Sequence, residues 1–146
     1  MANTARQNIL NSIKTTLEAI VDGDGVARFK SVTLGRIPSI SLETTPLPCI
    51  IVYTEREERI QDGVEAVIGK ENWDWTVILE VWAYDEDSEN VLNWIHTAMY
   101  GNYKFDNYAI YSERMGVDFL TIDAENRLDA MLIPYRIVYR HTLGVM

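Results

Sequence analysis

The residues that could do chemistry in this chain are few. It contains a single cysteine, Cys49, and two histidines, His96 and His141. A serine or cysteine hydrolase needs a nucleophile, a base and an orienting acid, and the sequence has no Gly-x-Ser-x-Gly segment. Cys49 lies in an apolar run, where a free cysteine behaves as a small buried hydrophobe. These residues predict no nucleophilic catalysis.

Acidic residues are numerous, but their spacing does not predict a metal site. Residues 22–25 (Asp-Gly-Asp-Gly) look like the start of a calcium loop but lack its later ligands and closing Glu. The acids of residues 85–90 are better placed at the positive start of a helix. Zinc-type pairs and glycine-rich phosphate loops are absent from the sequence. We therefore expect no enzyme, metal or cofactor, and a carboxylate pair assembled by folding is the catalytic alternative left open.

Composition narrows the class of protein. The 146 residues fit one domain, residues 1–146, with 47% hydrophobic and 24% charged residues. A net charge of −9 argues against a surface that grips nucleic acid, which needs clustered lysine and arginine. No apolar run approaches the roughly 20 residues that cross a bilayer, and the first residues do not read as a signal peptide. We expect a protein assembled in the cytoplasm, without a membrane.

Residues 73–84 are the strongest structural signal. Trp73, Trp75, Val77 and the later odd-numbered positions are all apolar, whereas the even-numbered positions are mixed. This alternation predicts a long strand with one face on a core. At about 3.3 Å per residue the strand would span roughly 40 Å. Trp82 and Tyr84 lie on its second face, and they need a cover from a helix or a partner chain.

The other segments complete an α+β pattern. Apolar residues at helical spacing predict helices over residues 4–21, capped by Asn3, and over residues 87–100. Strands are predicted at residues 26–34, 49–53, 108–114, 117–122 and 130–141, and Pro134 places a bulge or an edge in the last strand. Sequential strands usually pair. The sequence thus predicts a mainly antiparallel, twisted sheet, arranged as a meander, with two helices packed on one face.

Three stretches suit contact with a neighbouring subunit. The charged run of residues 55–59 is a solvated loop, a strand extension or a protruding hairpin arm. The second face of the long strand and the apolar C-terminal tail are the others, although disorder is an equal alternative for the tail. The expected interface residues are Glu55, Arg56, Glu57, Glu58, Arg59, Trp82, Tyr84, Leu143 and Val145.

The order of these segments resembles the tail terminator family of long-tailed bacteriophages, also called tail completion or tail-to-head joining proteins. The resemblance rests on an N-terminal amphipathic helix, a proline-flanked apolar strand at 46–53, and a charged excursion with a tryptophan-containing strand at 55–84. An acid-started helix at 87–100 and a Tyr/Arg strand at 135–140 follow. It covers nearly the whole chain as a match of layout and size, and no functional residue is carried over by it.

This resemblance implies a structural virion protein of the tail and neck. It implies a homo-oligomer, a hexameric ring that caps the tail tube, stops its polymerisation and joins a neck or head-completion protein. DNA would pass through the lumen without specific binding, and acidity suits this because like charges repel. The alternatives are another phage neck or tail-tube protein, or an α+β module that binds a small ligand on its aromatic face.

Overall fold

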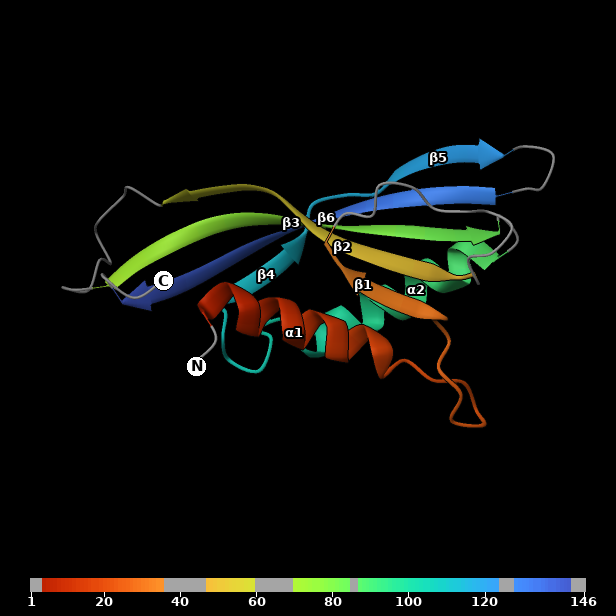
Figure 1. Ribbon diagram of the computed structural model, residues 1–146, viewed down its shortest axis with the longest axis horizontal. Helices are drawn as coiled ribbons and strands as arrows, with labels where there is room; N and C mark the ends of the chain where they lie inside the picture. Colours follow the sequence, from red (N-terminus) through yellow and green to blue (C-terminus); the bar gives the residue numbers. More distant parts are fainter. Residues whose placement is uncertain (1–3, 36–46, 60–69, 85–86, 124–127, 143–146) are drawn as a thin grey trace.

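The computed structural model describes residues 4–35, 47–59, 70–84, 87–123 and 128–142 (Figure 1). Its elements, in chain order, are α1 (Ala5–Glu18), β1 (Ser31–Leu34), β2 (Cys49–Arg59), β3 (Lys70–Tyr84), α2 (Ser88–Gly101), β4 (Tyr111–Arg114), β5 (Asp118–Asp123) and β6 (Leu128–Thr142).

All six strands form one sheet in the order β1-β2-β3-β6-β4, with β5 also paired to β6. Only β1 and β2 run parallel, and the other pairs are antiparallel. Both helices lie on the same side of the sheet (Figure 1). The predicted α+β class, with a mainly antiparallel sheet and two helices on one face, is therefore confirmed.

The meander is only partly correct. β2 and β3 are antiparallel neighbours, as predicted, but the second neighbour of β3 is the last strand, β6. Helix α2 and the strands β4 and β5 come between β3 and β6 in the chain, so the central pair of the sheet joins segments far apart in sequence. Long apolar alternation on both β3 and β6 explains this choice, because the two longest half-buried strands bury most surface side by side.

The long strand follows the predicted alternation. Trp75, Val77, Leu79 and Val81 are buried in the core, and Trp73 packs against it. The helices contribute the apolar stripes that cover this face, chiefly Ile9, Ile13 and Leu17 of α1 and Val91, Ile95 and Met99 of α2. The strand begins at Lys70, three residues before the predicted start.

Helix α1 differs from the prediction at both ends. Thr4, which is predicted to be the first helical residue, is instead the N-cap. Its hydroxyl accepts a hydrogen bond from the Gln7 N–H, and the Gln7 side chain accepts one from the Thr4 N–H. This reciprocal capping box fixes where the helix starts. The predicted cap, Asn3, lies outside the described residues. The helix ends at Glu18, and Val21 instead forms an isolated bridge to Ala27.

Helix α2 begins after Asp87, close to the predicted start, although no cap hydrogen bond forms from the Asp87 side chain. A tight loop follows the helix, in which Phe105, Asp106 and Asn107 all have positive φ angles of 47–70°. Left-handed conformations of non-glycine residues are costly. Hydrogen bonds from Asn102 to Thr16 and from Ser12 to Asp106 hold the loop against α1.

The shorter strands are corrected more strongly. The predicted strand at 26–34 is reduced to Ser31–Leu34, because Arg28 and Lys30 donate their N–H groups to the Ile20 and Pro48 carbonyls in bends. The predicted strand at 108–114 starts at Tyr111. The strands predicted at 117–122 and 130–141 are present as β5 and β6, with ends shifted by one or two residues.

The predicted bulge or edge at Pro134 is not found in its own strand. Pro134 lies in the interior strand β6, with no register shift against β3. Its carbonyl accepts from Met115 at 2.9 Å, between the end of β4 and the start of β5. Because the N and C=O of one strand residue point the same way, the missing N–H of Pro134 falls at this break. The irregularity therefore appears in the partner strand, and β6 itself stays regular.

Candidate assembly interface

The charged run at residues 55–59 is the distal half of β2. Its residues pair with β3 from Arg56↔Thr76 to Arg59↔Trp73, after a bulge between Thr54 and Arg56. Of the three predicted possibilities, the structure shows a strand extension. β1 pairs only with positions 49–52 of β2. Among the described residues, no strand covers the outer side of this charged half.

Alternation along the strand separates the charges into two sets. Arg56 and Glu58 form an ion pair, with 71% and 58% of their side chains exposed. Exposed pairs of this kind contribute little to stability, typically below about 1 kcal/mol. These two residues are therefore available to a neighbouring subunit at small cost to the fold.

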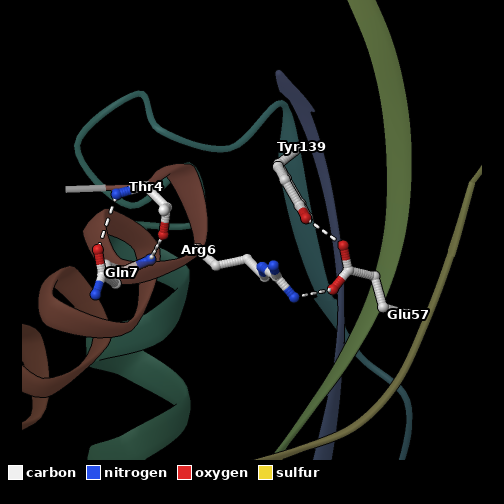
Figure 2. Close-up of polar contacts among 5 residues, drawn as sticks. All are labelled: Thr4, Arg6, Gln7, Glu57 and Tyr139. Carbon is white, nitrogen blue, oxygen red and sulfur yellow. Dashed lines mark hydrogen bonds and ion pairs between the residues drawn. The ribbon is translucent and has the colours of Figure 1, made fainter. Parts of the chain in front are cut away.

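Glu57 points the other way, toward α1 and β6 (Figure 2). Arg6 Nη1 donates to Glu57 Oε2 at 3.0 Å, and the Tyr139 hydroxyl donates to Glu57 Oε1. Only 18% of the Glu57 side chain is exposed. Glu57 therefore joins three elements of its own subunit, and its predicted place at a subunit interface stays a prediction.

Burial and charge also act on Tyr139. Removal of its ring from water raises the pKa of the Tyr139 hydroxyl, and the hydrogen bond to Glu57 raises it further. Both causes favour the protonated hydroxyl, which is the form that donates to the carboxylate. The ring also packs edge-on against Trp75, with centroids 5.8 Å apart. The Arg6–Glu57–Tyr139 contact is thus a polar clamp between α1 and the sheet.

The start of α1 positions this clamp. The Thr4 capping box fixes the first turn, and Arg6 extends from that turn across to β2 (Figure 2). A groove of about 460 Å³ lies beside the clamp, bordered by Gln7, Leu10 and Trp75. This groove opens between the beginning of α1 and the charged half of β2.

Trp82 and Tyr84 lie at the other end of the sheet. They are on the face away from the helices, since alternate residues of β3 point into the core. Trp82 is partly buried and its Nε1 donates to Glu80 Oε2 at 2.9 Å, whereas Tyr84 is exposed. The structure therefore does not bring them together with residues 55–59. Leu143 and Val145 lie outside the described residues.

The residues that could take part in catalysis lie in different elements of the fold. Burial, with a smaller effect from Glu80, raises the pKa of the Cys49 thiol to about 11, so it is a poor nucleophile. His96 is exposed on α2, with its ring 6.5 Å from that of Tyr100. Within the described ranges, no group of three or more His, Cys, Asp or Glu side chains could hold a metal ion. No helix in that part of the chain is long and apolar enough to cross a membrane.

Two exposed apolar groups escaped the sequence reasoning. One surrounds the end of α2 and includes Tyr100, Tyr103 and Tyr108. The other lies on the β4–β5 edge and includes Met115, Phe119 and Leu120. The adjacent pair Phe119-Leu120 was a signal for the second group, because neighbouring strand residues face opposite ways and one sheet face alone cannot bury both.

Comparison of the chain with models of known protein families and with curated proteins returned no match.

Proposed function

We propose that this protein is a structural component of a bacteriophage tail, a terminator that forms a ring on the tail tube and joins it to the neck. The observation that carries the proposal is the arrangement of the elements. A helix-covered α+β sheet continues into a charged, strand-paired half of β2, in the order that the resemblance implied. Exposed Arg56 and Glu58 then suit contact between subunits.

A ring of identical subunits needs two different surfaces on each copy, because the contacts are head-to-tail. The charged half of β2 and the apolar β4–β5 edge are two such surfaces, and they belong to opposite edges of the sheet. The net charge of −9 supports a lumen past which DNA slides without adhering.

Reconstitution tests this function. Purified protein is added to polymerising tail-tube subunits of the same virus, and the tubes are measured by negative-stain electron microscopy. We expect growth to stop and a gold-labelled protein to lie at one tube end. Unchanged growth with label along the tube wall would favour the alternative of a tube protein, and unchanged growth without label would exclude both.

One observation favours the small-ligand alternative. A groove of about 530 Å³ opens on the sheet face away from the helices, bordered by Tyr53, Ile78, Leu132 and Pro134 with Glu55 and Asp118 beside them. An apolar floor with two carboxylates would suit a small cationic ligand. A screen of such compounds for a rise in melting temperature tests it, and no shift at millimolar concentration would remove this alternative.

A further inference from the structure

Strand β5 presents an uncovered edge. It pairs with β6 through Asp118↔Leu132, Phe119↔Met131 and Leu120↔Ala130, and no other strand of the described chain pairs with it. It lies at the outer margin of the sheet in Figure 1. Phe119 is 56% exposed and Leu120 46% exposed, although they lie on opposite faces. An apolar edge strand of this kind is a template for an added strand.

The direction of the backbone groups follows from two hydrogen bonds. Met115 donates to the Pro134 carbonyl at 2.9 Å and Ile110 donates to the Val138 carbonyl at 2.7 Å. Even-numbered residues of β6 therefore point their backbone groups toward β4 and β5. Phe119 is opposite the odd-numbered Met131, so its own N–H and C=O point outward from the sheet. These outward groups are available to a further strand.

The opposite margin of this half of the sheet is β1. It pairs with β2 on one side, and among the described strands none pairs with its other side. Lys30 directly precedes β1 and is exposed, without a hydrogen bond or ion pair from its side chain to the described residues. Only four residues long, β1 matches the central part of β5 in length.

Charge distinguishes the possible pairings. β5 begins at Asp118 and ends at Asp123, so two copies of β5 paired about a two-fold axis would place acid opposite acid. Two copies of β1 paired in the same way would place each Lys30 beside the Leu34 end of the other strand, without an opposite charge. Antiparallel pairing of β5 with β1 instead places the Asp123 end of β5 beside the basic Lys30, which favours the unlike pairing.

Topology sets the direction of this pairing. Through the chain of pairs β1-β2-β3-β6-β5, one parallel and three antiparallel, β1 runs antiparallel to β5. A neighbouring copy whose strands keep the same direction would thus offer β1 as an antiparallel partner for β5. Six such head-to-tail joints can close a ring.

We propose that β1 of one copy adds to the free edge of β5 in the next copy, so that the sheet continues from subunit to subunit. This inference rests on the ring proposed above: β1, on the same edge of the sheet as the charged half of β2, meets the β4–β5 edge of the next copy. Lys30 lies at one end of the joint, and the outward backbone groups of Phe119 lie at its centre. Phe119 and Leu120 each gain cross-strand neighbours on their own face of the continued sheet.

Cross-linking tests the joint without a substitution. Equal amounts of ¹⁴N- and ¹⁵N-labelled protein are mixed under assembling conditions, treated with a water-soluble carbodiimide and digested for mass spectrometry. We expect a mixed-label peptide that joins Lys30 to Asp123, because antiparallel pairing brings the end of β5 beside the start of β1. Mixed-label cross-links that form only elsewhere, or a wild-type protein that remains monomeric at millimolar concentration, would overturn the proposal.

A matched pair of variants tests the backbone contact. Phe119→Pro removes an outward N–H but no β5–β6 hydrogen bond, whereas Phe119→Ala removes the side chain and keeps the N–H. We expect Phe119→Pro to raise the concentration at half-assembly about tenfold above that of Phe119→Ala. The β5 amide exchange of the monomer verifies that each variant is folded.

If Phe119→Pro and Phe119→Ala both fold and assemble equally well, the proposal that a strand adds to β5 is wrong. If Phe119→Pro does not fold, the cross-linking result alone tests the joint. If tubes still stop growing while no β1–β5 link forms, the ring function survives and this joint fails. If the link forms but tubes grow unchecked, the joint survives and the tail function fails.

Discussion

The two halves of β2 belong to one continuous strand but have opposite surroundings. The first half, Cys49 to Val52, is buried between β1 and β3. In the second half, Arg56 and Glu58 are exposed and no described strand covers the outer side, whereas Glu57 turns inward. The change occurs at the bulge at Glu55. A single strand can thus supply both core and exposed surface, and the inward charge of Glu57 ties the exposed half to the fold.

The largest effect should come from the first half of β2. Ile50 is fully buried in the core, so Ile50→Ala should lower the free energy of unfolding by about 2–5 kcal/mol through lost burial and a cavity. Urea unfolding of the purified protein measures this change. A loss below about 1 kcal/mol would mean that the two halves do not differ as described.

A smaller loss should come from the clamp in the second half. Glu57→Ala removes the acceptor of both Arg6 and Tyr139 and should cost about 2 kcal/mol, because hydrogen bonds to a charged group are among the stronger ones. Glu58→Ala, one residue on, is the matched control and should change stability by less than about 0.5 kcal/mol.

A double-mutant cycle of Glu57→Ala with Tyr139→Phe sharpens this comparison. The two changes should be non-additive, since the residues share one hydrogen bond. Additive losses of stability, or equal losses in the Glu57 and Glu58 variants, would contradict a stabilising role for the Arg6–Glu57–Tyr139 clamp.

Tyr135 offers a gain in stability. Its hydroxyl is buried without a hydrogen-bond partner among the described residues, so Tyr135→Phe should raise the free energy of unfolding by up to about 1 kcal/mol at neutral pH. Burial raises the Tyr135 pKa from 10.0 to about 12. The contribution of the protonated Tyr135 hydroxyl to the free energy of unfolding is therefore fully present below pH 10, and it is lost as the pH rises toward 12. Thermal unfolding at pH 7 and pH 10–11.5 checks both; destabilisation at pH 7 would contradict the missing partner.

The smallest effect on stability belongs to the exposed pair. Arg56→Glu should change the free energy of unfolding by less than about 0.5 kcal/mol and yet weaken assembly, because a neighbouring subunit would meet the reversed charge. Sedimentation velocity measures the assembly. The swap of Arg56→Glu with Glu58→Arg restores the internal pair as a control. Loss of folding in the single variant would place Arg56 in the scaffold instead.

Some of this structure follows from local sequence. The period-two pattern around Trp75 and Leu79 predicts β3, because strictly alternating apolar residues lie on one face only when the chain is a strand. The stripe of Ile9, Ile13 and Leu17 predicts α1 for the same reason at helical spacing. In both cases the pattern that predicts burial is formed by residues that are close together in the chain.

The remainder depends on distant partners. A run of five charges does not reveal that Glu57 meets Arg6, 51 residues away, because alternation gives a face but not its orientation. Pro134 in an interior strand needed the break between β4 and β5 to lie opposite it, and the predicted gap at residues 115–116 does not reveal which strand that gap faces. The parallel pairing of β1 and the exposed edge at Phe119 likewise depend on the strand order, which the sequence pattern leaves open.

Tail length in the virus that encodes this protein tests the central claim most directly. With the gene removed, we expect electron micrographs to show tails of abnormal, uncontrolled length that are not joined to heads. Wild-type protein supplied in trans should restore normal tails, and the Arg56→Glu variant should restore them less well. Tails of normal length, joined to heads without this gene, would contradict the proposed function.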